Sequence, residues 1–136
     1  MRIPILLCLA TAACASTPAD IARQQTRGAE AQAEVAKALA GLTAGEPATC
    51  LSAIERRTAR AETHGTTILY RVGSDRVYRN DMNGNCDQLS RDPILVTQTP
   101  SGALCRGDIA QLVDRGSRVS IGACAYGSFV PYRRAS

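Results

Sequence analysis

Four cysteines have the clearest capacity for chemistry in this chain. Intervals of 36, 19 and 19 residues separate Cys50, Cys86, Cys105 and Cys124. A zinc site usually takes thiolates from pairs about two to four residues apart, and this spacing differs from that pattern. An even number of distant cysteines in a short exported chain indicates disulfides instead. We therefore expect two disulfides and no zinc if the chain leaves the cytoplasm.

Four cysteines can pair in three ways, and their spacing alone does not choose among them. We favour the nested arrangement, with Cys50–Cys124 outside and Cys86–Cys105 inside, because a small curled sheet brings its first and last strands together. Each bridge would stabilise the fold by about 2–4 kcal/mol, mainly by restricting the unfolded chain.

The segment DMNGNCDQLSRD carries oxygen-bearing side chains at alternating positions. Positions 1, 3, 5, 7 and 12 of a calcium-loop count fall on Asp81, Asn83, Asn85, Asp87 and Asp92. Calcium loops use this alternation, but the glycine expected at position 6 is Cys86. The same residue types are common in turns, where they hydrogen-bond locally. We interpret the segment as a turn, keep calcium as the lesser alternative, and predict no metal or other cofactor.

The candidate catalytic groups are few. His64 is the single histidine and lies beside Gly65 in an expected turn. A cysteine nucleophile needs a free thiolate, which a disulfide lacks, and no G-x-S-x-G motif is present. We therefore expect no enzymatic activity. Separate, solvated side chains are the simpler interpretation of four arginines that could converge on an anion, namely Arg71, Arg79, Arg106 and Arg118.

The first residues have the layout of an export signal. Arg2 precedes an apolar run from Ile3 to Ala10, and small residues follow. The run is shorter than the roughly 20 apolar residues that span a bilayer. Two of the six cysteines, Cys8 and Cys14, lie in this leader, so the four described above remain whichever way it is cut.

Two cleavage sites are possible in this leader. The sequence TAAC resembles a bacterial lipobox, which would make Cys14 the acylated first residue of the mature protein, although Thr11 stands where leucine is usual. Ala15 after the cysteine would, by the same resemblance, permit sorting to the outer membrane. Cleavage after Ala15 would instead release a free protein that begins at Ser16. We favour lipidation, because a lone cysteine directly after a short apolar run is otherwise hard to explain.

The composition indicates a small core. The chain has one Phe, four Tyr and no Trp among 136 residues, and large apolar side chains supply most of the burial energy. A domain of this kind often needs covalent stabilisation. The net charge is +4, and no run of basic residues exceeds two. We therefore predict no binding to nucleic acid.

A long helix is expected before the cysteine-bearing region. Thr17 can cap it, Pro18 suits its first position and Asp20 its first turn. Good helix formers dominate as far as Ala40, and Gly41 is a natural stop. Large apolar residues are sparse, so the segment is either a stalk or partner helix, or a helix that docks with little buried area.

Short strands are expected after residue 47. TTILYRV and RVYRN predict a hairpin around residues 73–75, with Tyr70 opposite Tyr78 and Leu69 opposite Arg79. PILVTQT predicts another strand. DIAQLVD and RVSIGAC predict a second hairpin around residues 115–117, and a further strand is expected in 51–62.

The pattern C…TTILYR…RVYRND…C…LCRGDI…GAC…GSFVPYRR, over residues 48–134, resembles a family of small uncharacterised envelope proteins of alphaproteobacteria. That family has a signal or lipobox, a short helix and a four-cysteine C-terminal domain. The resemblance implies an envelope location and assigns no catalytic residues.

These features divide the chain into a signal and lipobox region (1–15), a helical leader or stalk (16–47) and a disulfide-bridged β-domain (48–136). The predicted fold class is α+β, with an N-terminal helix before a small, mainly antiparallel sheet or partly closed barrel. The predicted function is that of an exported, periplasmic module without catalysis, anchored to the outer membrane by lipid and able to bind an envelope protein. The alternative is a secreted inhibitor or binder of an envelope enzyme, which would use DMNGNCDQLSRD as its rigid loop.

Overall fold

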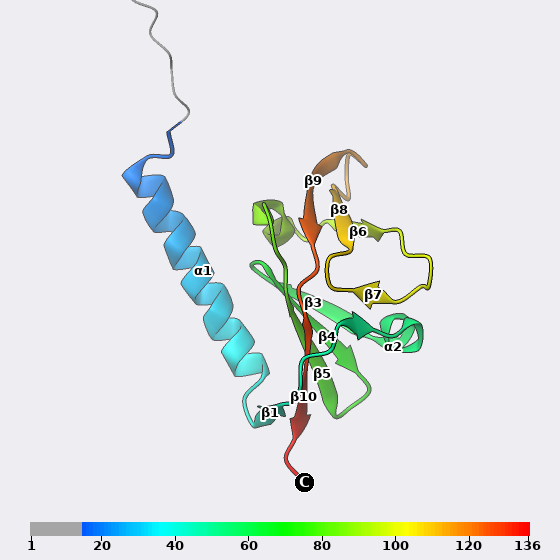
Figure 1. Cartoon of the computed structure of the whole chain (residues 1–136). Coiled ribbons are helices and arrows are strands. Elements are labelled where there is room, and N and C mark those ends of the chain that lie inside the picture. The colour runs from blue at the N-terminus through cyan, green and yellow to red at the C-terminus, as the bar shows by residue number, and fades with distance from the viewer. Residues whose placement is uncertain (1–14) are drawn as a thin grey trace, which may run out of the picture.

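The computed structural model describes residues 15–136. The predicted signal peptide and the predicted lipidation of Cys14 lie outside the described residues. A long helix, α1 (Pro18–Ala38), runs beside a β-domain built from three antiparallel sheets (Figure 1).

The largest sheet has five strands in the order β1-β10-β5-β4-β3. Their bounds are Leu42–Ala44, Phe129–Arg134, Arg76–Asp81, Thr67–Val72 and Arg60–His64. A three-stranded sheet has the order β6-β8-β9, with bounds Ile94–Thr97, Ile109–Val113 and Ser120–Ala125. A two-stranded ladder joins β2 (Cys50–Leu51) to β7 (Leu104–Cys105). Two short helices, α2 (Ala53–Thr58) and the 3-10 helix η1 (Asp87–Arg91), complete the domain.

The predicted α+β class is confirmed, with a long helix followed by a disulfide-bridged, mainly antiparallel β-domain. The strands form separate sheets and not the partly closed barrel that we allowed for. Both predicted hairpins are present as β4–β5 and β8–β9. In the first of them, Tyr70 lies opposite Tyr78 and Leu69 opposite Arg79, as predicted.

The start of α1 agrees with the prediction. The Thr17 side chain accepts a hydrogen bond from the backbone N–H of Asp20, whose carboxylate returns one to Thr17, so both halves of a capping box are present. The helix ends at Ala38, and Gly41 follows with φ of 77°. Glycine adopts this left-handed conformation without the steric cost that a Cβ would bring.

The strand predicted near 51–62 is confirmed only at the two ends of that range. Cys50 and Leu51 pair as β2 and Arg60 begins β3, but α2 occupies the residues between them. Ser52 caps this helix, and Glu55 lies at its third position and completes another capping box. The S-x-x-E pattern of residues 52–55 is a sequence signal for a helix start, and our prediction did not use it.

The two faces of the five-stranded sheet bury separate clusters, because successive side chains of a strand point to opposite faces. Ile68 and Tyr70 of β4 belong to the larger cluster, together with Phe129 and Leu112. Leu69 faces the other way and packs with residues of α1. The larger cluster fills the space between the sheets, and the smaller one attaches the helix.

The four cysteines form two disulfides, as predicted, but the predicted pairing is wrong. The bonds are Cys50–Cys105 and Cys86–Cys124, and neither Cys50–Cys124 nor Cys86–Cys105 forms. Cys50 lies directly opposite Cys105 in the β2–β7 ladder. Cys124 lies in β9, which pairs with β8 in a different sheet from β2, so the first and last cysteines do not meet.

Candidate functional site

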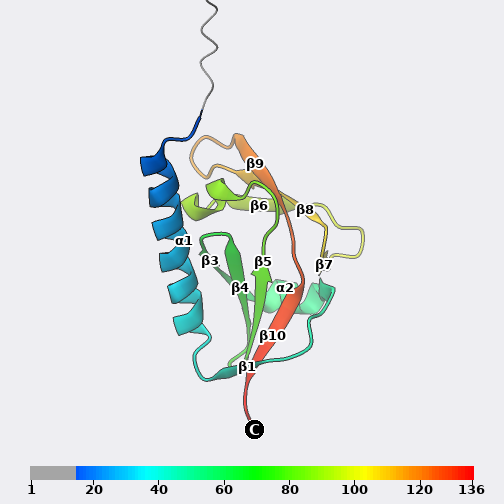
Figure 2. The same cartoon turned by 60° about the vertical axis from the view of Figure 1, so that its left-hand side comes forward.

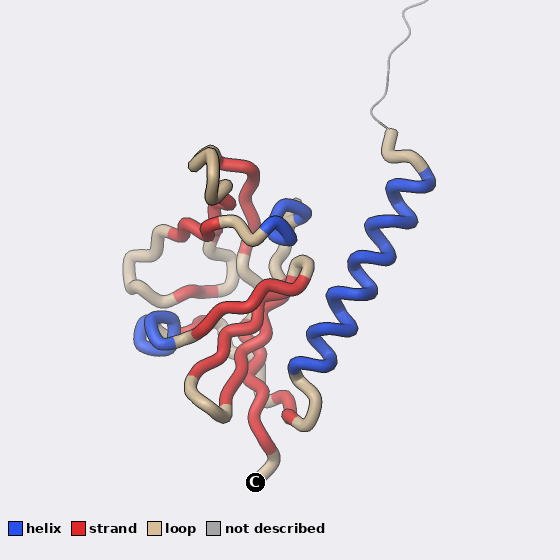
Figure 3. Tube along the Cα trace, turned by 180° about the vertical axis from the view of Figure 1, so that it is seen from behind, coloured by secondary structure: helices blue, strands red, loops and turns tan. Residues whose placement is uncertain are grey.

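The helix α1 is attached to the β-domain by its C-terminal third. Val35 and Leu39 are 0% and 7% exposed, and they pack against Leu69 of β4 and Val77 of β5. Every residue from 21 to 30 is exposed. Figure 3 shows the helix leaning away from the sheet toward its N-terminus, so most of its length remains open to solvent or to a partner.

A polar cluster joins the middle of α1 to the sheet. The Gln32 side chain donates to the Thr67 hydroxyl over 3.3 Å and accepts from the Arg79 guanidinium over 3.0 Å. Asp81 contacts the same two residues. Its carboxylate accepts a hydrogen bond of 2.6 Å from the Thr67 hydroxyl and one of 2.9 Å from Arg79 Nε. The hydrogen bond from Arg79 to the Asp81 carboxylate raises the pKa of Arg79 above its ordinary value. We call these four residues the polar clasp.

His64 belongs to the same seam between helix and sheet. Its Nδ1 lies 3.0 Å from a carboxylate oxygen of Glu34 on α1. Its Nε2 is buried without a hydrogen-bond partner among the described residues. The one histidine of the chain therefore joins the helix to the edge strand β3, in place of the solvated turn position that we expected.

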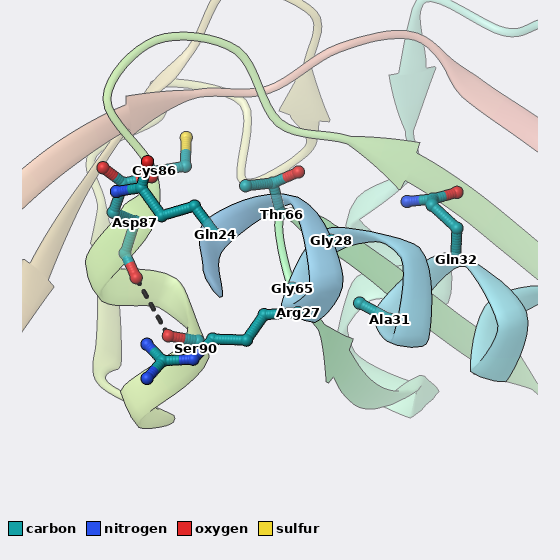
Figure 4. Close-up of a pocket in the computed structure, with 10 residues that line it drawn as sticks. All are labelled: Gln24, Arg27, Gly28, Ala31, Gln32, Gly65, Thr66, Cys86, Asp87 and Ser90. Atoms are coloured by element: carbon teal, nitrogen blue, oxygen red, sulfur yellow. Dashed lines mark hydrogen bonds between the residues drawn. The ribbon is translucent and has the colours of Figure 1, made fainter. Parts of the chain in front are cut away.

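Above the polar clasp, the seam opens into a groove of about 340 Å3 (Figure 4). The residues that line it are Gln24, Arg27, Gly28, Ala31 and Gln32 of α1, Gly65 and Thr66 of the β3–β4 turn, and Cys86, Asp87 and Ser90 at η1. Figure 2 shows α1 beside the β3–β4 turn along this seam. We call this cavity the helix groove.

The helix groove is lined by side chains of opposite charge. Arg27 lines it from the α1 side and Asp87 from the η1 side. Within the described part of the chain, neither side chain forms an ion pair. A cation and an anion of this kind can hold a polypeptide segment that carries both charges.

The five positions of the calcium alternative do not converge on one point. The Asp81 carboxylate belongs to the polar clasp, and Asp92 pairs with Arg115 at 3.3 Å. The backbone of Asn83 exchanges two hydrogen bonds with Ala125, of 2.8 and 2.9 Å. Residues 15–136 contain no cluster of three or more His, Cys, Asp or Glu side chains with metal-binding geometry. The segment is the turn of our first interpretation, closed by η1.

The four arginines that we considered for an anion site are placed separately. Arg71 pairs with Glu62 at 2.8 Å, and Arg79 pairs with Asp81. Arg106 follows β7, while Arg118 occupies a left-handed position with φ of 61° in the β8–β9 turn. Carboxylates therefore satisfy two of them, and the other two lie in different loops.

We did not predict the groove residues of α1 from the sequence. Gln24, Arg27 and Gln32 stood out only as good helix formers. A helical projection places 24, 28, 31 and 35 on one face, and Val35 marks that face as the docked one. This signal was available, but it gave no indication of which strand or turn would lie opposite.

No protein-family model matches the chain, and neither a curated protein nor a solved structure shows significant similarity to it. Its two disulfides indicate an oxidising environment and export from the cytoplasm. Among residues 15–136, no helix is both long and apolar enough to cross a bilayer. The fold and site therefore define a class, a small disulfide-bridged α+β domain with a partly detached helix.

Proposed function

We propose that this chain is an exported, non-catalytic envelope protein that binds a protein partner through the helix groove. The observation that carries the proposal is the exposure of the N-terminal half of α1 to solvent. A capped helix of 21 residues keeps its full length although residues 21–30 are all exposed. Most of the stability of a helix in a protein comes from packing one face against other elements, so the exposed part of α1 suits a partner that completes its packing.

The N-terminal leader supports an anchor at Cys14, in the outer membrane facing the periplasm. Cys14 lies three positions before Thr17, the cap of α1. Three extended residues span at most about 10 Å, so an acylated Cys14 would hold the start of α1 close to the lipid surface. The resemblance to alphaproteobacterial envelope proteins, over residues 48–134, supports the same location.

The intact mass of the mature protein, expressed with its own leader in a proteobacterial host, tests the anchor. A mass that begins at Cys14 and includes a diacylglycerol and an N-terminal acyl chain is expected. Reduction should add about 4 Da, one hydrogen for each of four cysteines. A mass that begins at Ser16 would contradict the anchor and leave export intact, whereas an uncleaved chain would contradict both.

Charge reversal at Arg27 tests the partner surface. Envelope proteins cross-linked to the wild-type chain should lose their cross-links to Arg27→Glu by tenfold or more, because the cation at one wall of the groove becomes an anion facing the same partner. Arg57→Glu, an exposed position on α2 outside the groove, is the matched control and should keep them. Equal loss in both variants, or in neither, would contradict the assignment of the groove.

A second function, inhibition of an envelope enzyme, is favoured by the loop at 81–92. Asn83, Gly84 and Asn85 are exposed, while Cys86 and Leu89 are 2% and 0% exposed and fasten the loop to the core. A rigid exposed loop is what an inhibitor presents. If this function holds, Asn85→Lys should release the partner and Arg27→Glu should retain it.

A further inference from the structure

The two disulfides differ in their access to solvent. Cys86 and Cys124 are each 2% exposed and belong to the larger core cluster. Cys50 is exposed and Cys105 is half-buried. Figures 1 and 2 both place β7, which carries Cys105, on the side of the molecule opposite to α1. One bond is therefore enclosed by the fold, and the other lies at its surface.

The exposed bond joins strands that have other attachments. Cys50 and Cys105 are register partners, and the neighbouring pair, Leu51 and Leu104, is 0% and 3% exposed. The backbone N–H of Arg106 donates to the Thr49 carbonyl over 2.7 Å. Burial of two leucines contributes several kcal/mol, so β2 and β7 can stay in place when the covalent bond between them opens.

Asp108 adds a further restraint on β7. Its carboxylate accepts a hydrogen bond of 2.8 Å from the backbone N–H of Cys105. The Arg56 guanidinium also donates to the Gly102 carbonyl over 3.0 Å, which ties the 98–103 loop to α2. These contacts would keep Cys50 and Cys105 side by side after reduction, so the two thiols are positioned to form their bond again.

We infer that Cys50–Cys105 is a thiol-exchange site that reacts with a dithiol reductant, while Cys86–Cys124 is a structural bond. Exchange requires a thiolate to reach a disulfide sulfur. The exposed Cys50 can be reached in the folded protein, whereas Cys86 and Cys124 are each 2% exposed and are shielded, although Cys86 borders the helix groove. This inference stands on the burial of the two bonds and is independent of the partner proposed for the helix groove.

The exchange reaction is balanced within the protein and the dithiol. A dithiol thiolate attacks Sγ of Cys50 and forms a mixed disulfide, while the electron pair of the broken bond leaves on Cys105, which takes up a proton. The second thiol of the reductant then attacks the reductant sulfur that is bonded to Cys50. This attack closes a disulfide within the reductant, and Cys50 leaves as a thiol. Two electrons and two protons pass to the protein, and the dithiol becomes a disulfide.

Differential alkylation of the mature wild-type protein tests the inference. The oxidised protein is incubated without denaturant in graded dithiothreitol, quenched in acid and alkylated, and each cysteine is quantified by peptide mass. Cys50 and Cys105 should become labelled at least tenfold faster than Cys86 and Cys124, with the circular dichroism spectrum unchanged. Equal rates, or faster labelling of the buried pair, would overturn the inference.

Two comparisons refine this experiment. In a concentration of urea that unfolds the chain, the rate ratio should fall to about one, because burial no longer protects either bond. A ratio that persists would assign the selectivity to local sequence and overturn the argument from burial. In a second arm, a reduced protein with a Cys-x-x-Cys site replaces dithiothreitol. Selective reaction in this arm identifies a protein dithiol as the reductant, and selectivity with dithiothreitol alone identifies a small one.

Discussion

Gly65 lies where α1 comes closest to the β-domain. Its φ is +59°, and a Cβ built there would lie 2.8 Å from the Cβ of Ala31. Any larger residue would combine an unfavourable backbone conformation with a clash. Gly28 lies on α1, about one turn before Ala31. It differs from Gly65 in both respects, because its φ is not in the left-handed region and a Cβ there would meet nothing within 4 Å. These two glycines line the same groove and form a matched pair.

Gly65→Ala should lower the free energy of unfolding by roughly 1–3 kcal/mol, the usual cost of a strained backbone position. Gly28→Ala should raise it by roughly 0.5–1 kcal/mol, because alanine favours a helix interior. Urea unfolding of both variants measures the difference. If Gly65→Ala proved more stable than Gly28→Ala, the close contact between α1 and the β3–β4 turn would be contradicted.

Glu55 is a carboxylate held by several hydrogen bonds, from Ser52, Arg76 and Tyr78. Burial by itself would raise its pKa, but hydrogen bonds from Tyr78 and Ser52, together with Arg76, lower the pKa below the ordinary value of 4.5. Tyr78 and Arg76 each donate to the same carboxylate oxygen over 2.8 Å. Because the folded pKa is the lower one, this group stabilises the fold above about pH 4.5 and loses that contribution as the pH falls through its folded pKa.

Glu55→Gln should therefore destabilise the protein at pH 7, and the deficit should be smaller at pH 3. The free energy of unfolding, measured in urea at both values, gives the comparison. Glu46→Gln is the control, since Glu46 is exposed and makes no side-chain hydrogen bond in the described part of the chain. A deficit of Glu55→Gln that is as large at pH 3 as at pH 7 would show that the carboxylate charge is not what stabilises this contact.

At the scale of elements, local signals predicted more than long-range ones. The caps of α1 and the two hairpins depend on residues close in sequence, and the structure confirms them. The capping box of α2 was equally local, but our prediction did not use it. The contact between α1 and the sheet could not be predicted. Gln32 bonds to Thr67 and Arg79, which are distant in the sequence, and no local pattern relates the three residues.

Val35→Ala tests whether α1 is a separable element. The substitution removes two buried carbons, worth roughly 1.5 kcal/mol at about 0.8 kcal/mol each, from a contact that involves few other apolar residues. Hydrogen exchange in 18–38 should rise tenfold or more while β4 and β5 keep their protection. Ala33→Ser, on the exposed side of the helix, should change neither. Loss of protection in β4 and β5 as well would show that helix and sheet unfold as one unit.

At the scale of the whole molecule, two disulfides reinforce a domain of three small sheets that share one modest core. Cys50–Cys105 lies within the β2–β7 ladder, and Cys86–Cys124 links the segment before η1 to β9. Bonds that close loops of this size stabilise by about 2–4 kcal/mol each, compared with about 5–15 kcal/mol for a whole domain. The number of bonds followed from counting cysteines. Their pairing depended on β2 pairing with β7 and β9 with β8, a topology that neither spacing nor periodicity specifies.

The redox state of Cys86 and Cys124 in protein taken directly from its native compartment is the most direct test of the account. The sample is alkylated at the moment of lysis, without reductant, and each cysteine is quantified by mass. Export into an oxidising environment predicts that both residues are unlabelled, whatever the state of the exposed pair. Substantial alkylation of Cys86 and Cys124 would contradict the account, because the folded domain would then exist without its buried bond.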